Sequence, residues 1–343
     1  MSRPGGPRDG SRRGSRGAHS LDESDIRIRP GRHGSRPRTK RRPEHADATG
    51  AMVVAVDRGR WTCAPEGDPT VRVTAMRARE LGRTPVVVGD RVGLVGEISG
   101  APDGLARIVR VDERTSVLRR TADDNDPYER IVVANAEQLL IVASLADPPP
   151  RTGLIDRCLV AGYAGGLEPV LCLTKRDLAT PDAVLERYAA LNLPVLVTAP
   201  ELGLDAVRAR LAGRVSVLVG HSGVGKSTLV NRLVPDAFRA TGAVSGVGKG
   251  RHTSSSAVAL PLLGGGWVVD TPGIRSFGLA HVTPDDVVRA FSDLAETIVN
   301  CPRGCTHLGP PADPECAMDE LDGAPHRRAM SVRVLLAALT ESG

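Results

Sequence analysis

One stretch near the middle of the chain decides how the rest is interpreted. It reads Gly220-His221-Ser222-Gly223-Val224-Gly225-Lys226-Ser227. The apolar run Val215–Val219 precedes it, and the helical stretch Thr228–Leu233 follows it. Glycines in this pattern let backbone N–H groups turn toward phosphate oxygens at a helix N-terminus. The alternative is a chance Gly-rich turn, but the flanking strand and helix favour a phosphate-binding loop (P-loop).

In such a loop, each of the last residues has its own role. We expect Lys226 to reach the β- and γ-phosphates and the Ser227 hydroxyl to hold Mg²⁺. Thr228 belongs to the same nucleotide-binding set as the loop residues. Lys226 is also a candidate catalytic residue, since it would neutralise charge on the phosphates.

A second motif, Asp270-Thr271-Pro272-Gly273, follows the apolar run Trp267–Val269, 43 residues beyond Ser227. A carboxylate at the end of a strand beside the phosphates is a usual partner of the magnesium ion. We therefore expect Asp270 on the magnesium side and Gly273 near the γ-phosphate. An ordinary type II turn is the alternative.

Between these two motifs lies a Gly-rich segment, residues 242–256, with four glycines within residues 242–250. This is where a switch loop is expected, with a threonine that completes the magnesium shell when a γ-phosphate is bound. Thr253 is the candidate, and Ser254 or Ser255 could substitute for it. A plain flexible loop is the alternative.

Two further turns follow buried apolar runs earlier in the chain. Thr174-Lys175-Arg176-Asp177 comes after Val170–Leu173, and Thr198-Ala199 comes after Val195–Val197. A carboxylate at position 177 can accept from the ring N–H and the exocyclic amino group of guanine, a pair that adenine does not offer. We expect Asp177 to select guanine, Lys175 to lie along the base, and the second turn to close over it. Both could instead be simple strand-end turns.

The pattern of apolar runs predicts the fold class. Near-continuous apolar runs at 139–143, 170–173, 195–197, 215–219 and 267–269 indicate strands buried on both faces, hence an α/β domain with a largely parallel sheet. Before them, short β-rich runs at 52–56, 70–73, 86–88, 91–95 and 106–111 suggest a small OB-type β-barrel. A small β-sandwich or an SH3-like barrel would have a similar pattern. The chain after residue 281 has helical character.

Charge is distributed unevenly along the 343 residues. Residues 1–50 contain 13 basic and 6 acidic side chains, whereas the other 293 contain 32 and 34. The first fifty residues hold few large apolar side chains, which predicts a disordered basic tail that contacts nucleic acid. A solubilising leader without a partner is the alternative. No signal peptide or membrane-length apolar run is evident, and six cysteines are too few for a disulfide scaffold, so we expect a cytoplasmic protein.

The order of the motifs is unusual, because the base-reading turns precede the P-loop. In this order, and in the segments 220–229, 248–255 and 270–278, the sequence resembles the circularly permuted GTPases of the ribosome small-subunit-dependent GTPase A family (RsgA, also called YjeQ). The resemblance implies an OB-fold RNA-binding domain at 51–120, a permuted GTPase domain at 121–280 and a zinc-binding region at 281–343. It also implies hydrolysis of GTP to GDP that is stimulated by the 30S subunit and its 16S rRNA, late in subunit maturation. We expect a monomer that does not bind membranes.

Two departures from the family pattern concern specific residues. Position 174 is Thr where the family usually has Asn, and a hydroxyl cannot supply both donors of an amide. The expected zinc ligands are Cys301, Cys305, His307 and Cys316, with a shorter first gap and a longer last gap than usual. Three thiolates and one imidazole still make a tetrahedral structural set; the alternative is free thiols and a surface histidine. Cys158 and Cys172 lie in apolar runs and are expected in the core.

The group that orients the hydrolytic water is also open. Ile274 occupies the position where many GTPases place a glutamine, and its side chain has neither donor nor acceptor. His252, beside Thr253, is the candidate catalytic residue; contact with rRNA or solvent is the alternative. Two other functions remain: an RNA-binding guanine-nucleotide switch without significant hydrolysis of its own, and a P-loop ATPase or kinase, which Asp177 argues against.

Overall fold

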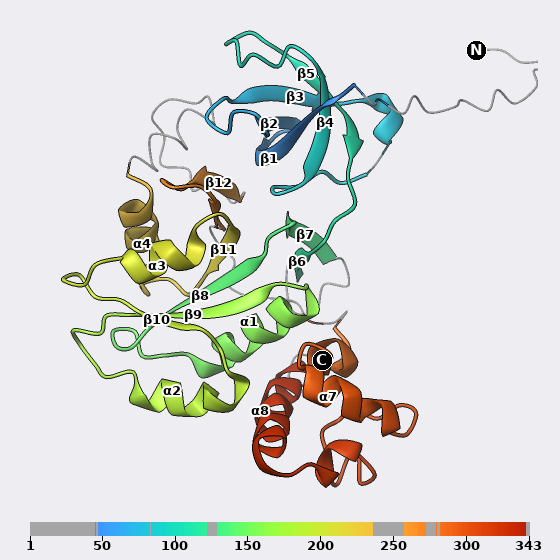
Figure 1. Cartoon of the computed structure of the whole chain (residues 1–343), viewed down its shortest axis with the longest axis vertical. Helices are drawn as coiled ribbons and strands as arrows, with labels where there is room; N and C mark the ends of the chain where they lie inside the picture. The colour runs from blue at the N-terminus through green and yellow to red at the C-terminus, as the bar shows by residue number, and fades with distance from the viewer. Residues whose placement is uncertain are drawn as a thin grey trace, which may run out of the picture. The chain divides into compact units, whose positions relative to one another are not determined.

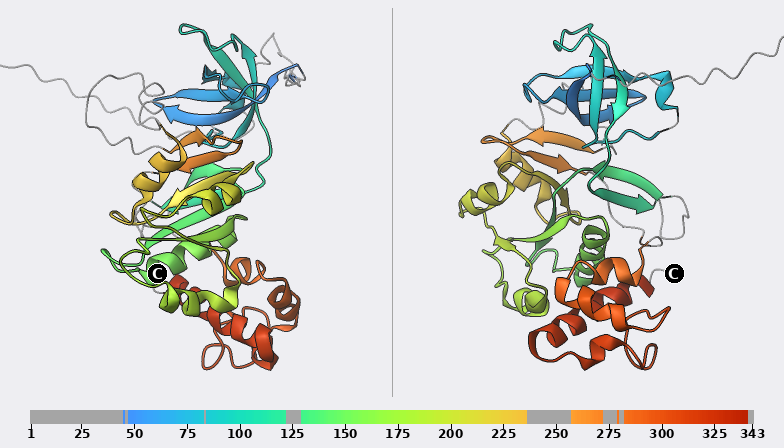
Figure 2. Two further views of the ribbon diagram at one scale, coloured as in Figure 1. Left: turned by 60° about the vertical axis from the view of Figure 1, so that its left-hand side comes forward. Right: turned by 45° about the vertical axis from the view of Figure 1, so that its right-hand side comes forward.

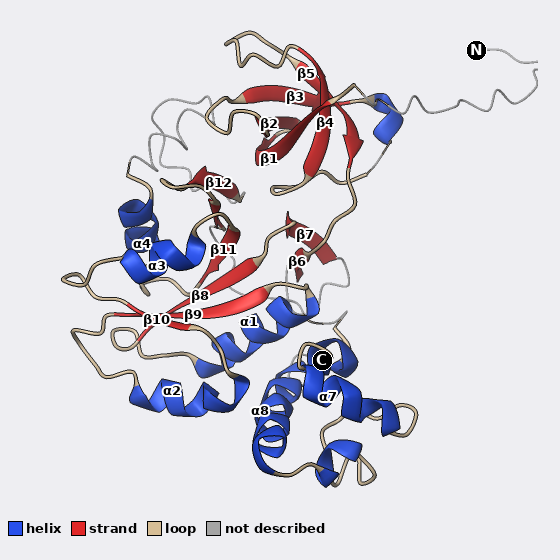
Figure 3. Ribbon diagram, viewed as in Figure 1, coloured by secondary structure: helices blue, strands red, loops and turns tan. Residues whose placement is uncertain are grey.

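The computed structural model describes residues 45, 47–82, 84–121, 129–235, 257–271, 279 and 282–340, which belong to a compact unit spanning Glu44–Gly343. Helices and strands are distinguished in Figure 3. The strands are β1 (Thr49–Asp57), β2 (Arg60–Pro65), β3 (Val73–Arg77), β4 (Arg91–Gly96), β5 (Ala106–Val111), β6 (Val117–Thr121), β7 (Glu129–Ala134), β8 (Gln138–Ser144), β9 (Glu168–Thr174), β10 (Val195–Val197), β11 (Val215–Val219), β12 (Val258–Pro261) and β13 (Trp267–Asp270). The α-helices are α1 (Thr152–Ala164), α2 (Asp182–Tyr188), α3 (Asp205–Leu211), α4 (Lys226–Leu233), α6 (Pro284–Val288), α7 (Ser292–Thr297) and α8 (Gly323–Thr340). Short 3₁₀ turns are η2 (Arg79–Leu81), η3 (Ala189–Leu191), η4 (Ile298–Asn300) and η5 (Ala317–Glu320).

The first five strands form a closed barrel, which confirms the barrel expected from the sequence (Figure 2). The hydrogen-bonded order is β1-β2-β3-β5-β4, and β4 pairs back with β1. Buried Val53, Leu94 and Ile108 are among its core side chains, and Trp61 donates from its indole N–H to the Val86 carbonyl at 3.0 Å. Closure leaves the barrel without a free edge strand.

Two of the barrel strands were predicted wrongly. Residues 86–88 form a loop, not a strand, and Val88 makes only an isolated bridge with Val133. The loop is held instead by the buried Asp90 carboxylate, which accepts from the Val87 N–H and pairs with Arg114 at 2.7 Å. The missing strand is β2, and β3 begins at Val73, where the predicted strand ended.

The central sheet has the predicted α/β character. The strands β10, β9, β8, β11 and β13 are parallel neighbours in that order, and β12 runs antiparallel to β13. All five predicted apolar runs are strands of this sheet. Three further strands were not predicted from the sequence. Strands β6 and β7 form an antiparallel pair, and β12 also pairs with β1, where Val258 lies opposite Ala55.

Helices cover both faces of this sheet (Figure 1). Alternate side chains of β8 show the division: Leu139 and Ile141 belong to the core cluster that includes side chains of α1, α2, α6 and α8, whereas Leu140 and Val142 belong to the cluster with α3 and α4. This two-sided burial explains why the strands are apolar throughout. Within the described part of the chain, we find no helix with the length and apolar character needed to cross a membrane.

Candidate functional site

The P-loop joins the end of β11 to the start of α4. Gly223 and Gly225 have φ angles of 84° and 91°, the left-handed region that only glycine adopts easily. A side chain at Gly220 would place its Cβ 2.5 Å from the Val142 carbonyl oxygen of the neighbouring strand β8. The loop therefore needs glycine at these positions, and its backbone N–H groups meet the N-terminus of α4 in an arrangement suited to anions.

The second motif lies directly beside this loop. Asp270 ends β13, where it is in register with Leu218 of β11, and its carboxylate forms an ion pair with the Lys226 ammonium. The buried Thr271 hydroxyl donates to the Leu218 carbonyl at 2.8 Å, which fixes the chain just after Asp270. Ser227 is exposed in the first turn of α4. The Ser227 hydroxyl and the Asp270 carboxylate are oxygen donors of the kind that Mg²⁺ prefers.

The turn after β9 is tied to the P-loop by one buried side chain. The Thr174 hydroxyl donates to the Val224 carbonyl at 2.6 Å, across 50 residues of sequence. Lys175 has a left-handed φ of 59°, and its ammonium contacts the Asp147 carbonyl. Arg176 and Asp177 are exposed, so the Asp177 carboxylate is open to a ligand.

The turn after β10 joins the same assembly. The Thr198 N–H donates to the Leu173 carbonyl at 2.8 Å, and the Arg176 N–H donates to the Thr198 carbonyl at 3.2 Å. The structure thus places the two predicted base-reading turns, 174–177 and 198–199, next to each other at the carboxyl ends of β9 and β10. This edge of an open parallel sheet is where ligands bind in α/β proteins.

Sequence reasoning missed an arginine that holds the second turn. Arg232, near the end of α4, donates through its two terminal nitrogens to the Ala199 carbonyl at 3.1 Å and the Leu202 carbonyl at 2.7 Å. The planar guanidinium suits two acceptors at fixed separation. The helix that begins at the P-loop therefore also fixes the turn at 198–202. No motif marks Arg232, because its partners lie 33 and 30 residues away.

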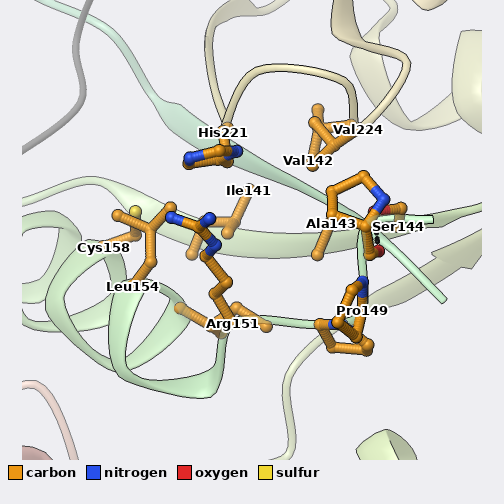
Figure 4. A pocket seen from close by; sticks show the side chains of 14 residues that line it. Ile141, Val142, Ala143, Ser144, Pro149, Arg151, Leu154, Cys158, His221 and Val224 are labelled. Carbon is orange, nitrogen blue, oxygen red and sulfur yellow. Dashed lines mark hydrogen bonds between the residues drawn. The ribbon is translucent and has the colours of Figure 1, made fainter. Parts of the chain in front are cut away.

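A small pocket flanks the P-loop on another side (Figure 4). His221 and Val224 of the loop, the end of β8 and the segment 148–151 line it. The Arg151 side chain extends along it toward His221 in Figure 4. Gly220, His221 and Val224 of the P-loop line this pocket, whereas Lys226, Ser227 and Asp177 do not.

Three predicted site residues lie outside the described residues: His252, Thr253 and Gly273. Their roles therefore stay predictions from the sequence. The other residues predicted to bind nucleotide fall into the two groups above, the P-loop with Asp270 and the paired turns, which the Thr174–Val224 hydrogen bond connects.

The four cysteine and histidine residues near the C-terminus form a compact cluster. One ligand atom from each of Cys301, Cys305, His307 and Cys316 lies within 4.8 Å of all the others. The His307 Nδ1 atom is 3.6 Å from the Cys301 sulfur and 4.0 Å from the Cys316 sulfur. Tetrahedral zinc with Zn–S bonds of about 2.3 Å needs ligands roughly 3.8 Å apart, so this donor set fits a zinc ion.

An aspartate outside the cluster orients its histidine. The Asp285 carboxylate, in the first turn of α6, contacts the His307 Nε2 atom at 2.9 Å, which leaves Nδ1 to face the sulfurs. His307 is buried, with only 2% of its surface exposed. A carboxylate on the outer nitrogen of a metal-binding histidine commonly fixes the ring and its tautomer. Sequence reasoning missed Asp285, which in the sequence resembles an ordinary helix N-terminal acid.

Cys158 and Cys172 lie in the core, as expected. Burial raises the pKa of each thiol to about 12, so both stay protonated and unreactive at neutral pH. Cys158, on α1, belongs to the core on one face of the central sheet, and Cys172, on β9, belongs to the core on the other face.

Comparison with known proteins agrees with these observations. The sequence model of the RsgA GTPase family matches residues 111–280. A small ribosomal subunit biogenesis GTPase RsgA from Chromohalobacter salexigens is 40% identical over 244 residues, covering 66% of this chain and 70% of the relative. The chain belongs to the RsgA GTPase family.

Two solved structures have a fold similar to that of this chain. YjeQ from Thermotoga maritima superposes with a TM-score of 0.62 at 25% identity, covering 85% of this chain and 98% of that chain. YloQ, described as a circularly permuted GTPase, gives a TM-score of 0.60 at 22% identity over 88% and 98%. The motif order in this RsgA-family member, with turns 174–177 and 198–199 before the P-loop, agrees with that permuted fold.

Proposed function

We propose that this protein is a GTPase that acts in the cytoplasm during biogenesis of the small ribosomal subunit. The observation that carries the proposal is the joined site: a P-loop beside Asp270, hydrogen-bonded through Thr174 to the turn that presents Asp177. The relatives named as ribosome-biogenesis GTPases support the cellular role.

Each residue of this site has a part in the proposed reaction, in which water cleaves GTP to GDP and phosphate. The N–H groups of Gly220–Ser227 and the Lys226 ammonium hold the phosphates, while Asp177 accepts from the base and Lys175 lies along it. Ser227 and Asp270, with Thr253, hold Mg²⁺, which neutralises charge on the phosphates when bound. His252 positions the attacking water.

The Cys301, Cys305, His307 and Cys316 cluster holds a structural zinc ion in this proposal. Zinc would fix the loops between η4 and η5 against α6 and α8, where Arg333 of α8 already donates to the His307 carbonyl at 3.1 Å. The proposed division of the chain is a basic tail at 1–50, an RNA-binding barrel at 51–120, a permuted GTPase domain at 121–280 and the zinc region beyond. The partners are the 30S subunit with its 16S rRNA, bound by a monomer.

Turnover with and without 30S subunits tests the proposal. We expect slow GTP hydrolysis by the isolated protein and a large stimulation by 30S subunits, with no competition from ATP. Binding of GTP and GDP without hydrolysis in either condition would favour a nucleotide switch that has no significant activity of its own. Displacement of GTP by ATP would favour an ATPase or kinase.

A further inference from the structure

We propose that this protein binds guanine nucleotides without a hydrogen bond from Thr174 to the N7 atom of the base. The inference rests on the proposed function, since it concerns the same nucleotide site. It follows from how the single donor of the Thr174 hydroxyl is used.

A threonine hydroxyl has one hydrogen to donate, whereas an asparagine amide has two. The Thr174 oxygen lies 2.6 Å from the Val224 carbonyl oxygen and 3.4 Å from the Ala143 carbonyl oxygen. Both neighbours only accept hydrogen bonds, so the hydroxyl hydrogen must point to one of them. The hydrogen points to the Val224 carbonyl, which is the nearer acceptor at 2.6 Å.

The surroundings keep the hydroxyl in this position. Thr174 is 6% exposed, and its branched side chain has few rotamers. Its side chain also packs beside Gly225, where an added Cβ would lie 3.7 Å from the hydroxyl oxygen. Turning the hydroxyl toward a ligand would leave the buried Val224 carbonyl without this donor, which is unfavourable.

The imidazole edge of guanine presents N7 and O6, both of them acceptors. Once its hydrogen is committed to Val224, Thr174 offers that edge only lone pairs, which do not bind an acceptor. The other edge of the base carries the N–H groups that a carboxylate accepts, and Asp177 is exposed for that purpose. The two edges are therefore recognised unequally in this chain.

An asparagine at position 174 would change this balance. One of its amide hydrogens can keep the bond to the Val224 carbonyl, and the second becomes available to the base. Thr174 therefore makes this chain tolerant of guanine analogues altered at N7.

The test is a set of four dissociation constants: GDP and 7-deaza-GDP, in which a C–H replaces N7, each measured with the wild-type protein and with Thr174→Asn. For the wild type we expect the two ligands to bind within twofold of each other. For Thr174→Asn we expect GDP to bind roughly threefold to tenfold more tightly than 7-deaza-GDP, the range of one net hydrogen bond. A general change of structure would alter both affinities together and leave their ratio near one.

Thr174→Ser is the matched control, because it keeps one donor and should keep the wild-type ratio. A wild-type preference for GDP of threefold or more would overturn the inference, even if Thr174→Asn does not fold. Equal binding of both ligands by folded Thr174→Asn would overturn it as well. Failure of the wild type to bind GDP at all would instead overturn the proposed function.

Discussion

At the scale of single residues, the site combines side chains whose roles differ in how far the sequence reveals them. Lys226 and Asp270 belong to short motifs with fixed spacing, and the structure places them in contact. Asp285 and Arg232 belong to no such motif, because their partners are distant in sequence and only the fold brings them together. The role of Asp177 is less easily predicted than those of Lys226 and Asp270, because its four-residue motif is specific only in combination with the P-loop that follows.

Replacing Asp177 with Asn should exchange the base preference. The amide can donate to the carbonyl that xanthine carries in place of the amino group of guanine, but it loses two charge-assisted hydrogen bonds to guanine. We expect GTP affinity to fall by at least roughly tenfold and xanthosine triphosphate affinity to rise. Equilibrium titration of both nucleotides measures this. Asp182→Asn, an exposed change five residues away, is the control, and unaltered GTP affinity in Asp177→Asn would exclude its base-reading role.

Removing the carboxylate of Asp285 should weaken zinc binding. Without it, the His307 ring loses the partner of its Nε2 atom and the constraint that turns Nδ1 to the sulfurs. Loss of such a partner commonly lowers metal affinity by about 10- to 100-fold. Titration of Asp285→Ala with a competing zinc chelator measures the change.

The matched control for that experiment is Arg289→Ala. Arg289 pairs with the other oxygen of the same carboxylate at 2.7 Å, in an exposed position, and does not touch His307. Wild-type zinc affinity in Asp285→Ala would show that the carboxylate does not orient the ligand.

At the scale of elements, strands buried on both faces were the easiest to predict, because their apolar runs have one explanation. A short apolar run that is not a strand was misassigned as one. Residues 86–88 are apolar, yet the ion pair of Asp90 with Arg114 and the left-handed Gly89 hold them as a loop. Strand β2, with Arg60 at its start and Pro65 at its end, has too irregular a pattern to reveal its hydrogen-bonded position between β1 and β3.

Helix α4 connects the two ends of the nucleotide site, which gives Arg232 a measurable role. In Arg232→Ala, the carbonyls of Ala199 and Leu202 lose their donors, and the turn above the proposed base site loosens. We expect GDP affinity to fall roughly tenfold, as for the loss of hydrogen bonds from a charged donor. The GDP affinity of Arg232→Lys should lie between those of the wild type and Arg232→Ala, because an ammonium cannot span both carbonyls as a guanidinium does.

Calorimetric titration with GDP measures this effect, and Arg208→Ala is the control. Arg208 donates to the Arg232 carbonyl at 3.0 Å but does not reach the turn in the described contacts. If Arg232→Ala binds GDP as the wild type does, the turn is held by its own backbone hydrogen bonds.

At the scale of the whole molecule, the basic residues of the first fifty positions contrast with the slightly acidic remainder. Deleting residues 1–45 should reduce affinity for 30S subunits and flatten its dependence on salt, because fewer counterions are released from RNA on binding. Co-sedimentation across a series of salt concentrations measures the slope. Neutralising only the basic run at 36–42 should reproduce part of the effect, and an unchanged slope after the deletion would exclude the tail from the interface.

His252 is also tested at this scale, because its proposed role depends on the ribosome. His252→Ala should lower 30S-stimulated turnover by about 10²-fold, the lower end for a positioned acid–base group, with little change in GTP or 30S binding. His326→Ala, on helix α8, is the control for a general effect of losing a histidine. If His252→Ala keeps full 30S-stimulated turnover, groups supplied by the ribosome position the attacking water.

The strand order has a consequence for synthesis of the chain. Strands β8, β9 and β10 are consecutive in sequence and adjacent in the sheet, so all three strands of the edge that carries Asp177 are translated before β11. Asp270 follows Asp177 by 93 residues, which at about 5–20 residues per second takes roughly 5–20 s. Until that interval ends, the nascent chain has the strands of the proposed base-recognition edge but lacks Asp270 beside the P-loop. The permuted order thus makes nucleotide binding a late event in the protein's own translation.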